Sequence, residues 1–361
     1  MANGSALKGL ILSGGKGSRL RPFTYTGAKQ LVPIANRPVL FYAIQHLVDA
    51  GITDIGIVVG ETGDQVRTAV GDGSAFGARV TYIEQPKPLG IAHGIIVARE
   101  FLAGDPFVLF LGDNFLRGGI APLVERFRDD NAASYVLLCP VPNPREFGIA
   151  ELADDGRLLR VVEKPSDPVS NLAVIGIYLF DSRVHEAVSA IRPSARGELE
   201  ITDTIQYLLD AGMPVRAHLV EGSWIDTGKM DDILQANRLM LDDVEPRIDG
   251  SVDEASSVQG KVLIGSGASI VNSVVRGPAV IGNDTRISNS YIGPFTCIDH
   301  GCIIEDSEIS GSVVMEHTSI RAIGHRIEDS LIGRYVELAG GRLKPRGYRL
   351  VLGDHSKVEG P

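Results

Sequence analysis

The last third of the chain carries a loose repeat, and this repeat limits the possible folds more than any other feature of the sequence. Beyond about Glu245, isoleucine followed by glycine recurs among many short pairs of valine and isoleucine, at Ile264-Gly265, Ile281-Gly282, Ile292-Gly293 and Ile332-Gly333. Such a pattern is typical of hexapeptide repeats, whose short strands stack coil upon coil and bury one apolar strip. We therefore predict a β-helix over residues 245–361. An ordinary β-rich domain with many turns is the alternative.

The first two-thirds of the chain have a different pattern. Apolar segments at 7–12, 54–59, 79–85 and 107–111 are interpreted as buried strands. Helical patterns lie between them, including one that Pro38 opens and Gly51 closes and another over about residues 91–102. This alternation predicts a parallel sheet with helices on both faces. From Ser134 onward, turn signals such as Asp154-Asp155-Gly156 indicate an antiparallel extension of the same sheet. We predict an α/β fold with a Rossmann-like mixed sheet in residues 1–244, and a length of 361 residues fits two domains.

A glycine loop directly follows the first predicted strand. Its glycines and the cations after them are Gly14, Gly15 and Gly17, then Arg19, Arg21 and Lys29. Backbone N–H groups in such a loop form an anion-binding concavity, so we predict a phosphate site. The order is not that of a P-loop, and Leu20 stands where a dinucleotide-binding fingerprint needs its third glycine. A glycine-rich turn with exposed basic residues is the alternative.

Three carboxylates and a lysine are candidates for the chemistry. Asp113 and Asp226 each follow a predicted strand, and two converging carboxylates can hold Mg²⁺ together with substrate phosphates. Glu163 and Lys164 stand at another strand end, where a carboxylate can bind sugar hydroxyls and an ammonium can bind phosphate. The alternatives are turn-capping aspartates and an exposed ion pair. We see no Ser-His-Asp arrangement, and His93 is interpreted as structural.

Bulk properties exclude several classes of partner. A net charge of −10 argues against general binding of nucleic acid or anionic membranes. No apolar run is long enough to span a bilayer, and the first five residues lack the features of a signal peptide. Cys139, Cys297 and Cys302 show no metal-site spacing. We expect buried free thiols and a cytoplasmic protein.

Several motifs together carry a family resemblance. In chain order, these motifs are the glycine loop through Pro22, Lys29-Gln30-Leu31-Val32-Pro33, Leu111-Gly112-Asp113-Asn114, Glu163-Lys164-Pro165 and Trp224-x-Asp226-Thr227-Gly228. Together and in this order, they resemble the signature of the sugar-phosphate nucleotidylyltransferases. The segments 85–92, 194–203 and 71–74 narrow the resemblance to the glucose-1-phosphate thymidylyltransferases. It covers Leu7 to Leu241, and the repeat-rich tail is similar to that of their long form, found in bacterial secondary metabolism and in archaea.

The resemblance implies a fold and a reaction. The fold is a nucleotidyltransferase domain in residues 1–244 followed by a C-terminal left-handed β-helix domain in residues 245–361. The reaction is the Mg²⁺-dependent transfer of a nucleotidyl group from dTTP to glucose 1-phosphate, giving dTDP-glucose, a precursor of deoxysugars, and pyrophosphate. The sugar phosphate would attack the α-phosphate in line. We expect the tail to pack between subunits of a homo-oligomer; an acyltransferase activity that uses His300, His317 or His325 is the alternative.

The resemblance also implies residue roles. The catalytic residues would be Arg19, Lys29, Asp113, Lys164 and Asp226, and Asp113 and Asp226 would bind Mg²⁺. The nucleotide-binding residues would be Leu12, Gly14, Gly15, Gly17, Gln30, Gln85, Pro88 and Gly90. Among these, Gln30 would contact the deoxyribose, and Gln85 and Gly90 would read thymine. The sugar-binding residues would be Gly148, Glu163, Val174 and Trp224, with Phe147 standing where relatives often carry tyrosine.

Two other functions remain open from the sequence. A UTP-dependent uridylyltransferase would share the mechanism, because one methyl group separates thymine from uracil and changes binding by only about 1–3 kcal/mol. A non-catalytic regulatory subunit that binds sugar nucleotides should have lost the phosphate cations or the metal carboxylates. The chain retains all of them, and a dinucleotide-dependent oxidoreductase is disfavoured by Leu20.

Overall fold

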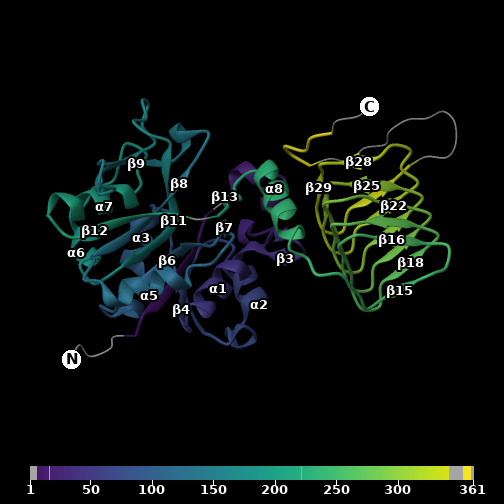
Figure 1. The fold of residues 1–361 in the computed structure, drawn as a ribbon, viewed down its shortest axis with the longest axis horizontal. Helices are drawn as coiled ribbons and strands as arrows, with labels where there is room; N and C mark the ends of the chain where they lie inside the picture. Colours follow the sequence, from purple (N-terminus) through teal and green to yellow (C-terminus); the bar gives the residue numbers. More distant parts are fainter. Residues whose placement is uncertain (1–5, 16, 221, 341–352, 359–361) are drawn as a thin grey trace. The chain divides into compact units, whose positions relative to one another are not determined.

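The computed structural model describes residues 6–15, 17–220, 222–340 and 353–358 (Figure 1). Its contacts divide the chain into two compact units. The first unit contains Met1–Lys16 and Val39–Asp226, and the second contains Gly17–Pro38 and Thr227–Pro361. Within the predicted β-helix segment 245–361, residues 341–352 and 359–361 lie outside the described residues. The segment Gly17–Pro38 therefore belongs with the C-terminal part of the chain, although its neighbours in sequence do not.

A mixed sheet forms the centre of the first unit (Figure 1). Its parallel strands stand in the order β6 (Phe107–Leu111), β1 (Lys8–Ser13), β4 (Asp54–Val59) and β5 (Arg79–Glu84). Its extension comprises β8 (Ser134–Pro140), β9 (Gly148–Leu152), β10 (Leu158–Glu163), β11 (Leu172–Phe180) and β12 (Val215–Leu219). Strand β11 joins the two parts because it is antiparallel to both β6 and β8. The predicted mixed sheet and its antiparallel extension are confirmed.

Helices cover this sheet, as the alternating pattern predicts. They are α1 (Val39–Asp49), α2 (Gly63–Val70), α3 (Ile91–Val97), α4 (Arg99–Leu102), α5 (Ala121–Asp129), α6 (Val184–Ala190) and α7 (Ile201–Asp210), with the short 3₁₀ helices η4 (Ser74–Phe76) and η5 (Pro144–Glu146). The single helix expected over 91–102 is wrong in one respect. Ala98, with φ −85° and ψ 2°, separates α3 from α4.

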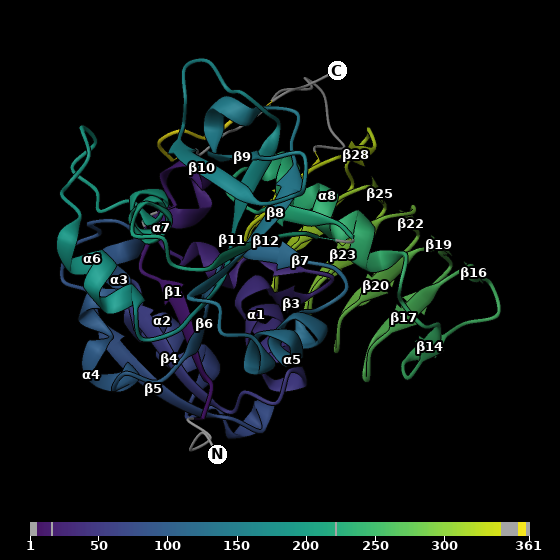
Figure 2. The same cartoon turned by 60° about the vertical axis from the view of Figure 1, so that its left-hand side comes forward.

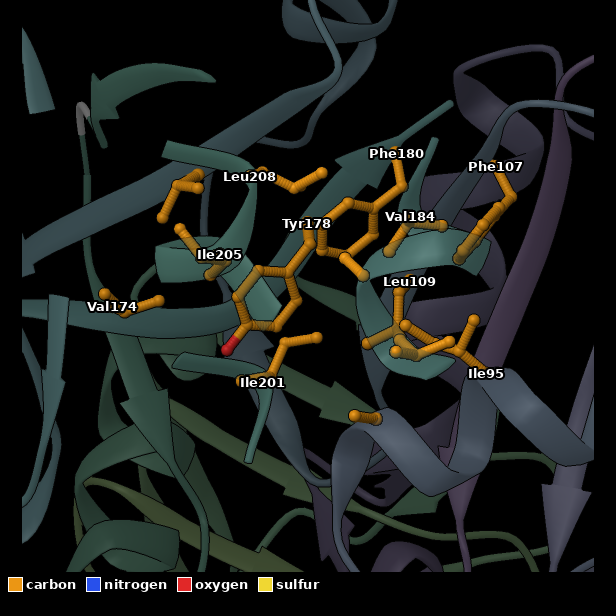
Figure 3. Close-up of a cluster of buried hydrophobic side chains, with 14 of the residues drawn as sticks. Ile95, Phe107, Leu109, Val174, Tyr178, Phe180, Val184, Ile201, Ile205 and Leu208 are labelled. Atoms are coloured by element: carbon orange, nitrogen blue, oxygen red, sulfur yellow. The ribbon is translucent and has the colours of Figure 1, made fainter. Parts of the chain in front are cut away.

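The main core of the first unit lies between the sheet and helices α3, α6 and α7 (Figure 3). Tyr178 and Phe180 of β11 stack with ring centroids 5.8 Å apart, and Ile201 and Ile205 of α7 pack in the same cluster. Each large apolar side chain buried this fully stabilises the fold by about 1.5–3 kcal/mol. On the other sheet face, Gly9 lies against Leu47 of α1, and an added Cβ would lie 2.8 Å from it. This two-sided packing fixes the strand ends where the predicted site residues stand.

A β-helix occupies the C-terminal part of the second unit, and Figure 2 shows its strands stacked coil upon coil. One stack is β14 (Arg247–Ile248), β17 (Val262–Ile264), β20 (Ala279–Ile281), β23 (Thr296–Ile298), β26 (Val313–Val314) and β29 (Leu331–Ile332). The next is β15 (Ser251–Val252), β18 (Ser269–Val271), β21 (Arg286–Ser288), β24 (Ile303–Glu305), β27 (Ser319–Arg321) and β30 (Glu337–Ala339). The third is β16 (Ser257–Gln259), β19 (Val274–Arg276), β22 (Tyr291–Ile292), β25 (Glu308–Ser310) and β28 (Ile327–Glu328).

The pairing within each stack is parallel and confirms the β-helix that the repeat predicts. Ile264, Ile281 and Ile298 occupy equivalent inward positions in successive coils and are fully buried. The corners are tight, because residues such as Asn272 and Asn289 adopt left-handed φ angles of 46° and 49°. The short side chain of asparagine tolerates this conformation better than most. The predicted α/β fold class with a β-helix is confirmed.

The rest of the second unit packs beside the coils. It contains helix α8 (Met230–Leu241), the hairpin of β2 (Pro33–Ile34) and β3 (Arg37–Pro38), and the 3₁₀ helices η1 (Ser18–Leu20), η2 (Phe23–Tyr25) and η3 (Lys29–Leu31). Cys297 and Cys302 are buried free thiols as predicted, whereas Cys139 is only half-buried. Among the described residues, no helix has the length and apolar character that a membrane crossing needs.

Candidate active site

The two predicted metal carboxylates lie on neighbouring backbone segments of the first unit. Strand β7 (Asn114–Leu116) begins directly after Asp113, and it pairs antiparallel with β13 (Trp224–Asp226). In this register Asp226 lies opposite Asn114, one residue beyond Asp113. Residues from distant parts of the sequence are thus brought together, and Asp113 is only 6% exposed. The backbones of the two predicted metal ligands are therefore close together, and their binding of a shared ion stays a prediction.

This pair fits a magnesium ion by its chemistry. Mg²⁺ prefers hard oxygen ligands and is usually held by one or two carboxylates plus substrate phosphates. The described residues contain no group of three or more histidine, cysteine, aspartate or glutamate side chains able to hold a metal ion. Two aspartates on neighbouring backbone segments are compatible with an ion whose other ligands come from a polyphosphate.

Asn114 links this pair to the predicted sugar site. Its Oδ1 accepts a 2.7 Å hydrogen bond from Trp224 Nε1 and a 3.2 Å bond from the Gly176 N–H. The amide therefore ties β13 and β11 to the strand that follows Asp113. Sequence reasoning assigned no role to Asn114, although it stands in the quoted motif Leu111–Asn114.

The predicted sugar-binding residues Gly148, Glu163 and Val174 meet at the ends of β9, β10 and β11. An added Cβ on Gly148 would lie 3.2 Å from Glu163 Oε2 and 3.9 Å from Val174 Cβ. It would also lie 2.6 Å from Cγ2 of Thr202 in α7, which is closer than real Cβ contacts occur. Glycine is thus needed at 148 because the helix approaches the strand so closely.

Glu163 is held in a mixed electrostatic setting. Its carboxylate lies 3.2 Å from Arg196 Nη1 and 3.8 Å from Lys164 Nζ, and Thr202 Oγ1 donates a 3.3 Å hydrogen bond to it. Burial raises the pKa of Glu163, and repulsion from Glu200 raises this pKa further, against the lowering effect of the two cations. Arg196 and Thr202 thus contact a predicted sugar-binding residue, and sequence reasoning gave them no role although both stand in the segment 194–203.

Lys164 has an unusual backbone conformation. Its φ is 40°, in the left-handed region that residues other than glycine seldom adopt, and its N–H donates a 3.0 Å hydrogen bond to the Phe147 carbonyl. Strain of this kind persists where the surroundings fix it, often at functional sites. Phe147, at the position where tyrosine was expected from the resemblance, packs edge-on against Trp224 with ring centroids 5.6 Å apart.

The predicted thymine-reading residues are also neighbours. Gln85 Oε1 would lie 2.9 Å from a Cβ on Gly14, and Gln85 Nε2 lies 3.5 Å from the Gly90 carbonyl. Gly90 has a φ of +102°, and a Cβ there would lie 2.5 Å from the Leu199 carbonyl oxygen. His93, which we had interpreted as structural, lies with Nδ1 2.9 Å from Gln85 Nε2. Its sequence signal is only its position in α3, one turn after Gly90.

Leu12, Gly15 and Pro88 are the remaining predicted nucleotide-binding residues of the first unit. Leu12 packs beneath α3, where a Cβ on Gly94 would lie 2.8 Å from its Cδ2. Gly15 and Pro88 are exposed. Nucleotide contact by these three residues stays a prediction.

The second unit carries the other predicted phosphate-binding residues. Gly17 has a φ of +60°, and a Cβ there would lie 2.9 Å from Cβ of Lys29, so the loop glycine and the lysine are packed together. Arg19 is exposed, and its charge helps to lower the pKa of Asp232, which burial raises. Gln30 is 1% exposed, and its Oε1 has no hydrogen-bond partner among the described residues.

Comparison with known proteins places this α/β chain in a class. The model of the nucleotidyl transferase family matches residues 8–243, and the chain belongs to this family. A glucose-1-phosphate thymidylyltransferase from Streptomyces griseus is 52% identical over 353 residues, covering 98% of this chain and 99% of the relative. The low-salt glycan biosynthesis nucleotidyltransferase Agl11 of Haloferax volcanii is 46% identical over 98% of this chain and 100% of its own length.

A solved structure gives a similar result. The crystal structure of a Bacillus anthracis protein, assigned by name as a glucose-1-phosphate thymidylyltransferase and bound to sucrose, is 39% identical with a TM-score of 0.62. It covers 65% of this chain and 95% of that one. The resemblance inferred from the motifs is confirmed, and the end-to-end match to the Streptomyces relative includes the β-helix region.

Proposed function

We propose that this enzyme transfers a thymidylyl group from dTTP to glucose 1-phosphate and releases dTDP-glucose and pyrophosphate. The observation that carries the proposal is the 52% identity, over 98% of the chain, with a glucose-1-phosphate thymidylyltransferase. The grouping of the predicted residues into a carboxylate pair, a sugar cluster and a base-reading cluster supports it.

The residues would divide the work by their chemistry. Glucose 1-phosphate is already a nucleophile, so its attack on the α-phosphate needs no strong base. The task is to hold two mutually repelling anions in line and to stabilise the charge that moves to pyrophosphate. Arg19 and Lys29 would contact the triphosphate, and Lys164 would hold the sugar phosphate beside Glu163, whose carboxylate would accept bonds from sugar hydroxyls.

Asp113 and Asp226 would hold Mg²⁺. A bound magnesium ion supplies charge neutralisation on the phosphate oxygens and orientation of the triphosphate. The chain would supply the two carboxylates, Asp113 directly before β7 and Asp226 at the end of the paired strand β13. Asn114 would connect these strands to the sugar site through its hydrogen bond with Trp224.

We also propose the finer features that the sequence implies. The nucleotidyltransferase domain would span residues 1–244 and the β-helix domain residues 245–361, and the protein would act in the cytoplasm as a homo-oligomer. Its product would feed deoxysugar formation in secondary metabolism. The 1–244 division follows the change in sequence pattern, and it differs from the contact-based units, which place Gly17–Pro38 with the C-terminal part.

The test is pyrophosphate release with dTTP, UTP, ATP, CTP and GTP against glucose 1-phosphate, with glucosamine and galactose 1-phosphates as challengers and with or without Mg²⁺. We expect the fastest turnover with dTTP, glucose 1-phosphate and Mg²⁺. Preference for UTP would retain the mechanism and overturn the assignment of Gln85 and Gly90. No release with any pair, from folded protein with Mg²⁺, would favour a sugar-nucleotide-binding regulatory subunit.

A further inference from the structure

The segment Gly17–Pro38, which carries Arg19 and Lys29, is packed onto the β-helix through helix α8. One buried apolar cluster joins all three parts. Its members are Leu20 and Val32 from the segment, Ile233, Leu234 and Leu241 from α8, and Val280, Cys297, Val313, Met315 and Leu331 from the coils. The segment that carries the two cations proposed to bind the triphosphate is therefore packed against α8 and the coils of the β-helix.

Hydrogen bonds fix the hairpin at the end of this segment. Ala35 and Asn36 form its two-residue turn with φ angles of 50° and 58°, as expected for a tight hairpin with both central residues left-handed. The Ala35 N–H donates a 2.9 Å hydrogen bond to Asn237 Oδ1 in α8. The Asn36 side-chain amide donates a 2.7 Å bond to the Ile298 carbonyl in a coil of the β-helix.

Asn237 lies at the junction of the three parts. It is 1% exposed, and its Nδ2 donates a 3.3 Å hydrogen bond to the Phe295 carbonyl. The Cys297 thiol lies 3.1 Å from Asn237 Oδ1 and can donate to it, since burial raises the pKa of this thiol to about 12. A single buried amide thus connects the hairpin, the helix and the coil.

These anchors lie on both sides of Lys29 in sequence. Before it, Gly17 packs against Lys29 Cβ, and Leu20 enters the apolar cluster. After it, the Leu31 carbonyl accepts a 3.5 Å bond from Arg334 of the β-helix, and Val32 enters the same cluster. The backbone of Lys29 is held at both ends by contacts that depend on α8 and the coils.

We propose that the β-helix is a positioning element for the transfer reaction, with Asn36 and Asn237 as positioning residues that act through Lys29. This inference rests on the proposed function of Lys29. Its physical basis is that a displacement of about 1 Å at a catalytic group can slow a reaction by about 100-fold. The β-helix would thus contribute to turnover without touching a substrate.

The test compares matched variants of the full-length protein. Asn36→Gly removes the amide and retains the positive φ, because glycine adopts this conformation readily. Asn289→Gly is the control, since Asn289 is another left-handed asparagine of the second unit, and its side-chain Oδ1 accepts an exposed hydrogen bond from Asn272 Nδ2. We expect Asn36→Gly and Asn237→Ala to lower kcat/KM for dTTP by about tenfold to 100-fold. The KM for glucose 1-phosphate should stay unchanged, and Asn289→Gly should behave as wild type.

A double-mutant cycle separates positioning from general stability. In a Lys29→Ala background, Asn36→Gly should lower the remaining activity by no more than about twofold, because its effect passes through the missing ammonium. If Lys29→Ala is inactive but Asn36→Gly matches Asn289→Gly, the positioning role is overturned and the proposed function stands. If Asn36→Gly lowers activity equally with and without Lys29, the positioning role is also overturned. Full activity of Lys29→Ala would overturn both the positioning role and the proposed function of Lys29.

Discussion

At the scale of single residues, Gln85 shows how neighbours set the direction of an amide. Its Nε2 faces Nδ1 of His93 at 2.9 Å, and its Oε1 lies on the Gly14 side. Burial lowers the pKa of His93, so the imidazole is neutral near pH 7 and Nδ1 can accept a hydrogen bond. A fixed amide presents its donor and its acceptor to a base in one order only.

This arrangement predicts an effect on base choice. Thymine offers an acceptor at the position where cytosine offers a donor, so an amide free to turn over should read both. We expect His93→Ala to lower the ratio of kcat/KM for dTTP over dCTP, with His93→Gln, which retains an acceptor, closer to wild type. Pyrophosphate release with each nucleotide measures the ratio. An unchanged ratio in His93→Ala would show that Gln85 needs no help from His93.

The same contact predicts a dependence on pH. The lowered pKa means that His93 becomes protonated only below the usual histidine value of about 6.5, and its Nδ1 then becomes a donor. The preference for dTTP over dCTP should therefore be constant above this pH and fall as the pH drops further. His93→Gln should lack the fall. A parallel decline in both proteins would assign the effect to another group.

The half-buried carboxylate of Glu163 is expected to lower the stability of the fold while it improves binding of glucose 1-phosphate. Its raised pKa means that the folded state binds this proton more tightly than the unfolded chain, so the ionised carboxylate disfavours folding above that pKa and the cost disappears as the pH falls. We expect Glu163→Gln to keep or raise the thermal midpoint at pH 7 and to raise the KM for glucose 1-phosphate. A lower midpoint at pH 7 would mean that the ion pair with Arg196 outweighs the burial.

Single residues were predictable from the sequence where a motif marks them. The motif Glu163-Lys164-Pro165 marks Glu163, and the family resemblance implies Gly148 and Val174; the structure brings these three residues together, and their contact with a sugar stays a prediction. The contacts of His93 with Gln85 and of Asn114 with Trp224 could not be predicted, because no local sequence pattern names these partners.

At the scale of elements, the close approach of β9 to α7 is the feature with the clearest consequence. Glycine at 148 lets the strand come within reach of Thr202, where a Cβ would be 2.6 Å from Cγ2. Overpacking a site like this typically costs about 1–3 kcal/mol, since neighbouring elements must shift.

Gly148→Ala should therefore lower the free energy of unfolding by about 1–3 kcal/mol and raise the KM for glucose 1-phosphate. Denaturant unfolding and steady-state kinetics measure the two effects. Gly324→Ala is the matched control, because a Cβ there meets nothing within 4 Å. A Gly148→Ala protein with unchanged KM would place the sugar away from this strand.

Most elements followed from periodicity and from their end signals. Strand β4 has the predicted bounds, and α1 begins after Pro38 and ends before Gly51 as expected. The division between α3 and α4 was missed, because alanine at 98 favours helix and gives no signal for a break.

At the scale of the whole molecule, the interleaving of the two units could not be predicted. The chain enters the second unit at Gly17, leaves it after Pro38 and returns at Thr227. Sequence patterns predict which segments are apolar, and the surface that Leu20 and Val32 cover is set by the tertiary fold alone.

Hydrogen exchange measured over the whole molecule tests whether nucleotide binding stabilises the second unit. With Lys29 bound to the triphosphate as proposed, dTTP with Mg²⁺ should slow amide exchange in residues 33–38 and in residues 295–298, since these segments share hydrogen bonds around Asn237. Residues 286–289, in another stack of the β-helix, are the reference and should change little. Slowing confined to residues 85–93 would show that the nucleotide does not act on the second unit.

The bond between Asn36 and the Ile298 carbonyl joins residues 262 positions apart. Ribosomes add about 5–20 residues per second, so about 13–52 s separate the synthesis of these two partners. During that interval the apolar side chains of Leu20 and Val32 have no coil to cover them. We therefore expect chaperones to bind this apolar segment until the C-terminal third has been synthesised, and the yield of active enzyme in cells to fall when chaperones are depleted.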